Sequence, residues 1–343
     1  GTMKSNALKL IAIASALVWT AGSASAQSAA EFYKGKTVEI YIGFGLGGTY
    51  GKSATIMGEY LKPRLGADSV IVKSMPGAGG LKMTNYYYNI APKDGSALML
   101  PPDTLVITEL LKPTKAKYKS SGLTWLGSAV RSNSMAAVRA DSGVKTWKDL
   151  LTKEVPFASS GLGSQTYQIP ALINGLLGTK IKIVKGYKGS RKMLLAMEQG
   201  EVAGINLSWL SFKTNRKEWF DKGFAVPVIQ LGPAPESDIK TVPLLSALVK
   251  KEDLPIVQFM SSLVSIGRSL AVPNQVPADR KAFLRAAFES MAKDPNFAAD
   301  MKKRKLEATF TNADEIQRVV TESLAMTPEI IARTNKILFG GAS

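Results

Sequence analysis

The sequence predicts an α/β protein whose two lobes surround a central ligand cleft. Strand-like and helix-like patterns alternate along the chain, which favours parallel strands covered by helices. Four turns rich in glycine or serine follow strand patterns, two in each half of the chain. About 315 residues remain after a leader-like N-terminus, which is enough for two domains with a core each.

The N-terminus, residues 1–26, has the pattern of a two-residue expression remnant followed by a secretory signal peptide. Lys4 and Lys9 supply positive charge. The apolar run Leu10–Trp19 is too short to span a bilayer, and Ala24-Ser25-Ala26 is typical of a cleavage site. A buried N-terminal helix is the alternative. We expect a periplasmic mature protein without lipid anchor or membrane span.

Lobe one is predicted over residues 27–129 and 235–343. Its first part has a strand–helix order that indicates a parallel sheet. The expected strands are Val38–Ile42, Val70–Val72 and Ala97–Leu100, with helices over Ser53–Leu65 and from the Pro76–Gly80 turn through Asn89.

Lobe two is predicted over residues 130–234, between the two parts of lobe one. The expected strands of this second series are Trp125–Val130, Ala136–Val138, Pro156–Ala158, Ile181–Val184, Val202–Asn206 and Val226–Leu231. Helices are expected within Asp141–Leu151, after Ser164 to Leu177, and through Gln199. The breaker-rich segment Gly232-Pro233-Ala234-Pro235 marks the crossing back to lobe one.

The last part of the chain is predicted to return to the first sheet through the strand Ser269–Val272. The helices expected after it are Ala278–Ala292, Pro295–Lys305, Asp314–Leu324 and Pro328–Leu338.

The turn Gly43–Ser53 matches two phosphate-binding motifs in part. A P-loop would need glycine where Leu46 stands. A dinucleotide site would need an acid at the end of the next strand, but Ser69–Val72 is followed by Lys73. Two interpretations remain: a helix start whose free N–H groups bind an anion, or a tight turn without a ligand.

Composition excludes several classes of function. The formal net charge is +17, but the lysines are spread along the chain, so we expect no nucleic-acid partner. The chain contains no histidine and no cysteine, which excludes Ser-His-Asp and Cys-His sites and disulfides. We expect no catalysis, cofactor or metal. The alternative is an exported hydrolase or lyase that uses serine, lysine or carboxylates.

The four turns are the candidate ligand site. In open α/β sheets, ligands bind beyond the carboxyl ends of the strands, where such turns gather. Glycines allow close backbone approach, hydroxyls add donors, and turns without acids suit a carboxylate. The turns are Gly43–Thr49, Pro76–Gly80, Ser159–Ser164 and Gly186–Ser190.

Five segments of the chain also resemble a known family, the Bug-type solute receptors of tripartite tricarboxylate transporters. They are "YKGKTVEIYIGFGLGGTYGKSATIMGEYLKPRLG", "VIVKSMPGAGGLKMTNYYYNIAPKDGSALML", "VPFASSGLGSQTY", "VKGYKGSRKMLLAMEQGEVAGIN" and "AVPNQVPADRKAFLRAAFESMAKDPNF". The resemblance covers nearly all of the chain after residue 26. It implies the type II periplasmic-binding-protein fold, a small organic carboxylate as ligand, the permease subunits of such a transporter as partners, and a monomer.

The resemblance also implies which residues line the cleft. The expected ligand-binding residues are Phe44, Leu46, Gly47, Gly48, Thr49, Tyr50, Gly77, Ala78, Gly79 and Gly80 from lobe one, and Ser159, Ser160, Gly163, Ser164, Tyr187 and Asn206 from lobe two.

The chain departs from the family at two positions. Gly51 stands where the family's first loop usually has an aspartate, and Tyr167 stands where histidine is common. The missing aspartate leaves the identity of the acid open. Tyr50 and Tyr187 either shape the pocket for a larger or aromatic acid or only pack.

Overall fold

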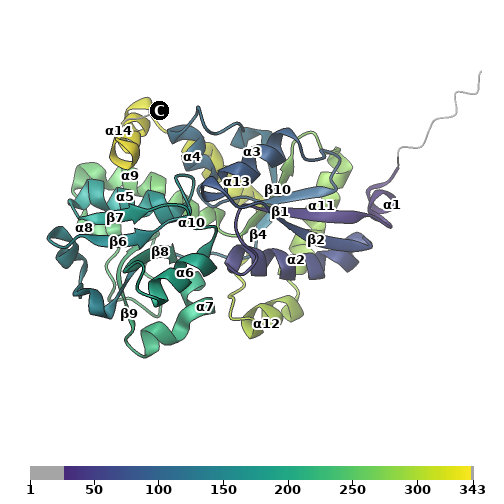
Figure 1. Cartoon of the computed structure of the whole chain (residues 1–343). Helices are drawn as coiled ribbons and strands as arrows, with labels where there is room; N and C mark the ends of the chain where they lie inside the picture. The colour runs from purple at the N-terminus through teal and green to yellow at the C-terminus, as the bar shows by residue number, and fades with distance from the viewer. Residues whose placement is uncertain (1–26, 341–343) are drawn as a thin grey trace, which may run out of the picture.

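Two five-stranded sheets, one in each lobe, organise the chain (Figure 1). The computed structural model describes residues 27–340. The predicted signal peptide, residues 1–26, lies outside the described residues. Within the described part, no helix is both long and apolar enough to cross a membrane.

The lobe-one sheet has the order β2-β1-β3-β10-β4. β1 (Thr37–Ile42) lies between β2 (Ser69–Ser74) and β3 (Ala97–Leu100) and runs parallel to both. β10 (Ser269–Pro273) is antiparallel to β3 and to β4 (Leu123–Ser128). The predicted return of the late strand to the first sheet is therefore confirmed.

The lobe-two sheet has the order β7-β6-β8-β5-β9 and repeats the same plan. β6 (Val155–Ala158) lies between β7 (Ile181–Val184) and β8 (Gly204–Ser208) and is parallel to both. β5 (Ser134–Arg139) is antiparallel to β8 and to β9 (Ala225–Leu231). In both lobes the parallel strands end at turns that face the other lobe.

Helices cover both sheets, and their ends follow from local sequence. Ser28 and Glu31 form a capping box at the first helix, and Gly66 ends the second helix in the left-handed conformation. The helices on the lobe-one side are α1 (Ala29–Tyr33), α2 (Thr49–Leu65), α3 (Leu81–Asn89), α4 (Leu105–Leu111), α11 (Ala278–Ala292), α12 (Pro295–Lys303) and α13 (Ala313–Leu324). Short 3-10 turns are Ala78–Gly80, Ser120–Gly122, Ala140–Ser142, Trp147–Leu151 and Lys251–Asp253.

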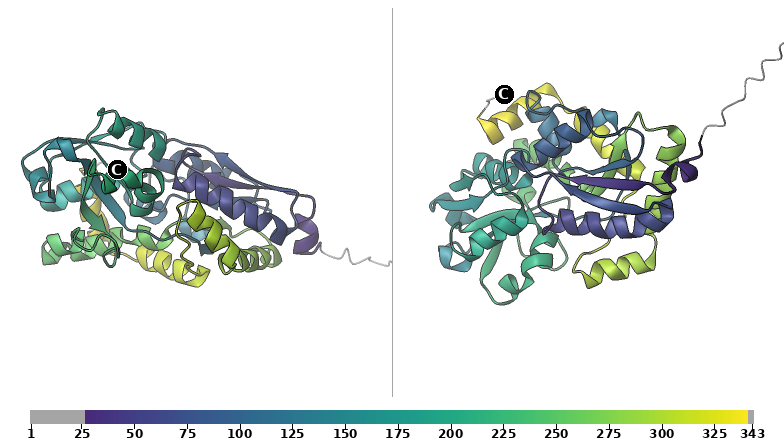
Figure 2. Two further views of the ribbon diagram at one scale, coloured as in Figure 1. Left: turned by 90° about the horizontal axis from the view of Figure 1, so that it is seen from below. Right: turned by 45° about the vertical axis from the view of Figure 1, so that its right-hand side comes forward.

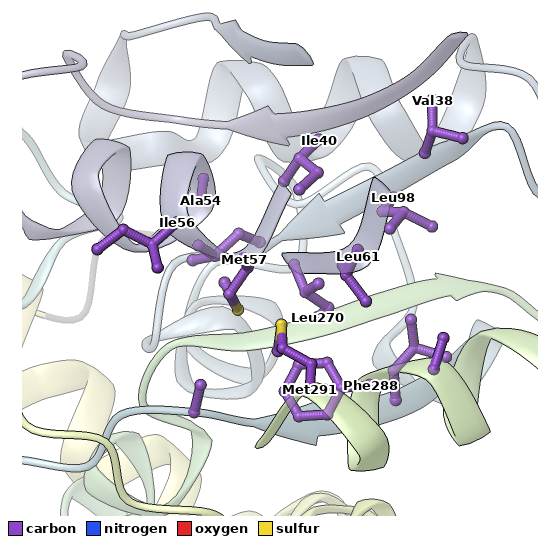
Figure 3. Close-up of a cluster of buried hydrophobic side chains, with 14 of the residues drawn as sticks. Val38, Ile40, Ala54, Ile56, Met57, Leu61, Leu98, Leu270, Phe288 and Met291 are labelled. Atoms are coloured by element: carbon purple, nitrogen blue, oxygen red, sulfur yellow. The ribbon is translucent and has the colours of Figure 1, made fainter. Parts of the chain in front are cut away.

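One core of lobe one joins segments from both ends of the chain. Figure 3 shows Met57 and Leu61 of α2 with Ile40 of β1, and Phe288 and Met291 of α11, all fully buried or nearly so. Burying such side chains stabilises the lobe by roughly 1.5–3 kcal/mol each. The C-terminal part of the chain is therefore an integral part of lobe one.

Lobe two also recruits helices from the last third of the chain. Its own helices are α5 (Gln165–Leu177), α6 (Ser190–Glu198) and α7 (Trp209–Asp221), and α8 (Leu245–Leu248), α9 (Leu254–Met260), α10 (Ser262–Ile266) and α14 (Pro328–Phe339) join its core. The Tyr167 and Phe339 rings stack with centroids 5.7 Å apart, which places α14 on α5 (Figure 2). The prediction assigns all of residues 235–343 to lobe one. The helices α8, α9, α10 and α14 depart from it, because their apolar side chains complete the lobe-two core.

Two of the connections between the lobes lie side by side. Ala129 and Val130 leave β4 toward β5, and each shares a backbone hydrogen bond with Arg268, which precedes β10 (3.1 and 3.0 Å). Gly267 has φ +52°, and a Cβ there would lie 2.0 Å from the Val130 carbonyl oxygen. Only glycine fits at this junction.

We expect Gly267→Ala to destabilise the protein by at least about 2 kcal/mol more than Gly178→Ala, because overpacking adds to the backbone strain. Gly178 has φ +74°, and a Cβ added there would meet nothing within 4 Å, so it controls for a positive φ without crowding. Urea unfolding followed by circular dichroism measures both variants. Equal losses would show that the contact with Val130 costs nothing.

Candidate functional site

The four glycine- or serine-rich turns meet in pairs across the two lobes. Gly45 N–H donates to the Lys188 carbonyl (3.2 Å), which joins the first turn to the fourth. Gly79 N–H donates to the Ser160 carbonyl (3.0 Å), which joins the second turn to the third. The structure is thus a closed form in which backbone touches backbone across the cleft.

Glycine is required where the second turn meets the third, because a side chain there would meet the backbone of lobe two. A Cβ on Gly79, which has φ +68°, would lie 2.5 Å from the Ser164 nitrogen. A Cβ on Gly48 would lie 2.2 Å from the Ser190 hydroxyl oxygen. The glycines that the sequence offers as ligand contacts therefore also permit the lobes to close.

A small cavity remains between the closed lobes. Its volume is about 30 Å³, which is space for one or two water molecules. An organic acid needs more room, so the lobes have to separate before one can enter. The lining residues are Phe44, Gly45, Gly48, Thr49, Tyr50, Asp103, Ser160, Ser164, Gln165, Thr166, Ser190, Met193, Leu207, Ser208, Ser211 and Arg268.

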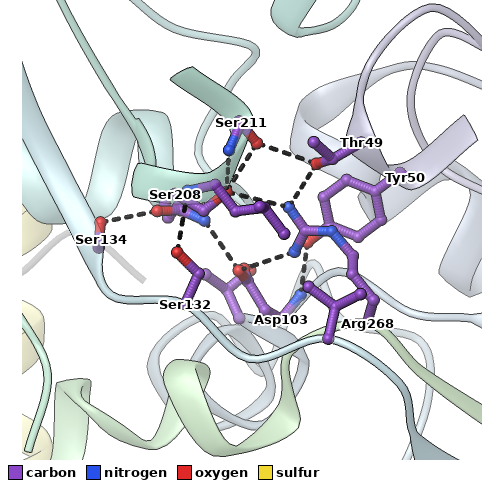
Figure 4. A network of polar contacts seen from close by, with 12 residues as sticks. Thr49, Tyr50, Asp103, Ser132, Ser134, Ser208, Ser211 and Arg268 are labelled. Atoms are coloured by element: carbon purple, nitrogen blue, oxygen red, sulfur yellow. Dashed lines mark hydrogen bonds and ion pairs between the residues drawn. The ribbon is translucent and has the colours of Figure 1, made fainter. Parts of the chain in front are cut away.

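Arg268 is the centre of the cavity's polar network (Figure 4). It is 4% exposed, and its guanidinium lies over the Tyr50 ring, 3.7 Å from the centroid. Nη2 donates to the hydroxyls of Thr49 (2.8 Å) and Ser208 (3.5 Å). Within residues 27–340, Nε has no acceptor.

Asp103, in the turn after β3, is the acidic partner of Arg268. Its Oδ2 lies 3.5 Å from Arg268 Nη1 and accepts a hydrogen bond from Gln165 Nε2 (2.8 Å). The Asp103 N–H donates to the Tyr50 hydroxyl (3.0 Å). Burial raises the pKa of Asp103 to about 6, although Arg268, Tyr50 and Gln165 all act to lower it.

Hydroxyl groups connect the two lobes beside this pair. The Thr49 hydroxyl, at the start of α2, lies 2.9 Å from that of Ser211 in α7, and the Ser208 and Ser211 hydroxyls are 2.6 Å apart. Farther into lobe two, Ser134 donates to Gln165 Oε1 (2.7 Å). The cavity is therefore ringed by groups that both donate and accept.

Some predicted ligand-binding residues line the cavity and others do not. Those in the lining are Phe44, Gly48, Thr49, Tyr50, Ser160 and Ser164. The other predicted residues are not among the lining residues: Leu46, Gly47, Gly77, Ala78, Gly79, Gly80, Ser159, Gly163, Tyr187 and Asn206.

Three of those residues have other surroundings. Leu46 is 55% exposed on an outer groove. The Tyr187 hydroxyl donates to Glu201 (2.6 Å), whereas Asn206 is buried and donates to the Ser134 hydroxyl (2.7 Å). Tyr50, by contrast, packs on Phe44 with ring centroids 4.5 Å apart and forms part of the cavity wall.

The charged residues of the cavity do not appear among the residues predicted from the sequence. Arg268 precedes a late strand and Asp103 follows an early one, and neither belongs to a glycine-rich turn. The antiparallel pairing of β10 with β3 brings them together. The sequence does contain a signal for both residues, because each is a charged residue close to the end of a predicted buried strand.

The comparison with solved structures places this fold among known proteins. No family model matches the chain, and no curated protein matches it. Among solved structures, the periplasmic binding protein BugD matches with a TM-score of 0.71 and 18% identity over 89% of this chain and 98% of BugD. MatC from Rhodopseudomonas palustris, with bound malate, gives 0.70 and 17% over 88% and 99%. A TctC solute binding protein from Polaromonas gives 0.60 and 16% over 89% and 98%.

The chain therefore has the bilobal periplasmic-binding-protein fold, which confirms the predicted fold class. Within that class, its fold is that of the Bug- and TctC-type solute-binding proteins, as the sequence resemblance predicts.

We expect Asp103 to make stability fall as pH rises from about 4 to 6. Its folded pKa, about 6, lies above the usual unfolded value near 3.9, so the folded state holds the extra proton in this window. Above the window, its ionised form costs up to about 3 kcal/mol.

The measurement is urea unfolding of the wild type and Asp103→Asn between pH 4 and 7.5. The stability of the wild type relative to the variant should decrease across the window and level off above it. A difference that instead increases with pH would show that Arg268 holds the pKa of Asp103 below its usual value.

Proposed function

We propose that this protein is a periplasmic receptor that captures a small organic carboxylate and delivers it to the permease subunits of a tripartite tricarboxylate-type transporter. The observation that carries the proposal is the buried Arg268 guanidinium, enclosed with a ring of hydroxyls between two lobes. A guanidinium with hydroxyl donors is the chemistry that recognises a carboxylate. MatC, of similar fold, is described with bound malate, which supports the proposal.

Binding couples to closure of the lobes. The turns contact each other across the cleft in this closed form, and a ligand that contacts both lobes favours closure of the lobes around itself. Thr49 and Tyr50 of lobe one and Ser160 and Ser164 of lobe two face the cavity from opposite sides. Of the other predicted residues, Gly79 holds the second turn against the third through its hydrogen bond to the Ser160 carbonyl.

The site is better suited to binding than to catalysis. A serine nucleophile needs a base within hydrogen-bond reach. Ser164 accepts from the Thr166 N–H (3.1 Å) as the cap of α5, and Ser208 accepts from the Ser211 N–H (3.1 Å) as the cap of α7. Among the described residues that line the cavity there is no lysine. We therefore propose a receptor that is not an enzyme.

We expect the purified protein, unfolded and refolded to remove any carried-over ligand, to gain thermal stability with at least one member of a panel of small carboxylic acids. A ligand at 100 times its Kd stabilises by about 2.7 kcal/mol. The amides of the same acids serve as controls without charge. Equal shifts with amides, or steady product formation, would contradict the receptor proposal.

We expect Gly79→Ala to weaken binding of the best acid by at least about tenfold, because the new Cβ would meet the Ser164 nitrogen at 2.5 Å and hinder closure. Gly66→Ala is the matched control, since Gly66 has φ +70° and nothing within 4 Å. Calorimetry measures affinity, and small-angle X-ray scattering measures compaction on binding. Compaction of the Gly79→Ala protein equal to that of the control would refute this role of Gly79.

A further inference from the structure

The Arg268–Asp103 pair is a loose ion pair and supplies the charge that the described lining residues bring to the cavity. The two groups are 3.5 Å apart at their nearest atoms, which is longer than the roughly 2.7–2.9 Å of a good charge-assisted hydrogen bond. Arg268 Nε, in a side chain that is 4% exposed, has no acceptor among residues 27–340. The guanidinium is thus held in place with its donors only partly used.

The surroundings hold Arg268 in a fixed position. Its backbone pairs with Ala129 and Val130 at the lobe junction, its guanidinium plane lies on Tyr50, and Nη2 donates to Thr49. Asp103, in contrast, lies in the short turn between β3 and α4 and reaches lobe two through Gln165. The Asp103 carboxylate is held by Gln165 and by Arg268 itself, so a ligand carboxylate that takes its place on Arg268 removes one of these two contacts.

We propose that Arg268 is the anchor of the ligand carboxylate and that Asp103 is an internal carboxylate that occupies this anchor in the ligand-free closed form. This inference rests on the proposed receptor function and adds the residue that confers specificity. The incoming acid exchanges with Asp103 and receives hydrogen bonds from Nε and Nη of Arg268, the bidentate arrangement that guanidinium groups favour.

The charges of the cavity specify a monocarboxylate. Among the described lining residues, Arg268 is the one cation and Asp103 the one anion. A second ligand carboxylate would be buried without a cation and beside Asp103, which is costly. The hydroxyls of Ser208, Ser211 and Thr49 suit a neutral polar group instead. A small hydroxylated monocarboxylate therefore fits the site better than a di- or tricarboxylate.

The exchange of Asp103 for the ligand carboxylate on Arg268 also links ligand binding to proton uptake by Asp103. Asp103 is faced by Arg268 from the segment before β10, by Tyr50 from α2 and by Gln165 from α5. When the ligand carboxylate pairs with Arg268, Asp103 loses part of its interaction with the cation and gains a negative charge beside it. Both changes favour the protonated form of Asp103. Affinity should then rise as pH falls from 7.5 to 5.5.

The test uses 2-hydroxybutyrate and malate, which differ mainly in one carboxylate, and calorimetry on the full-length mature protein. We expect the wild type to bind 2-hydroxybutyrate at least about tenfold more tightly than malate at pH 7.5. Arg268→Gln should weaken 2-hydroxybutyrate binding by about 100-fold. Arg318→Gln removes the same charge from an exposed position on α13 and should leave the affinity unchanged.

Asp103→Asn is the decisive variant, because altering a residue with a merely structural role would not increase the affinity of the protein for its ligand. We expect it to tighten 2-hydroxybutyrate binding by about tenfold at pH 7.5 and to remove the pH dependence. The double variant Asp103→Asn/Arg268→Gln leaves no unpaired buried charge, and we expect it to fold and to bind as weakly as Arg268→Gln.

The outcomes separate this inference from the receptor proposal. Equal binding of malate and 2-hydroxybutyrate, unchanged affinity in Arg268→Gln, or weaker binding in Asp103→Asn would overturn the anchor and leave a carboxylate receptor of another design. Binding of neither probe nor of any acid in the wider panel would overturn both.

Discussion

The buried guanidinium of Arg268 is the constraint around which the cleft is arranged. A charge removed from water is tolerated only when neighbouring groups compensate it. Here the compensation comes from distant parts of the chain: the Tyr50 ring, the Asp103 carboxylate and the hydroxyls of Thr49 and Ser208. These groups belong to both lobes, so satisfying the charge also defines how the closed lobes sit on each other.

Lobe closure and ligand binding use the same short segments. Glycines in the turns let backbone meet backbone, as at Gly79 and Ser160, while the hydroxyl residues beside them face the cavity. The junction at Gly267 and Val130 lies directly beside Arg268 in the chain. A movement of the lobes about this junction therefore changes the surroundings of the guanidinium, which gives a physical link between closure and carboxylate binding.

The regular pattern of the sequence predicts most of the fold. The helix Ala278–Ala292 and the return of Ser269–Val272 to the first sheet agree with the structure, because amphipathic spacing and a bounded apolar run carry local signals. The segment Leu254–Ile266 carries no such prediction. It forms α9 and α10, and a short run that is apolar on all sides does not distinguish a buried helix from a strand. Each of Arg268 and Asp103 lies next to a predicted strand, but their pairing depends on the tertiary contact of β10 with β3, which the local sequence does not specify.

The position of the missing aspartate shows how the cleft differs from one with an acid on its first turn. Gly51 lies near the start of α2, where a Cβ would be 2.0 Å from the Leu46 carbonyl oxygen, so the preceding turn, in its present shape, leaves no room for a side chain there. The cleft nevertheless contains a carboxylate, supplied by Asp103 from the turn after β3. That carboxylate is paired with a cation, the Arg268 guanidinium. The described lining residues have no net charge when Asp103 is ionised and one positive charge when it is protonated, and an anionic ligand favours the second state.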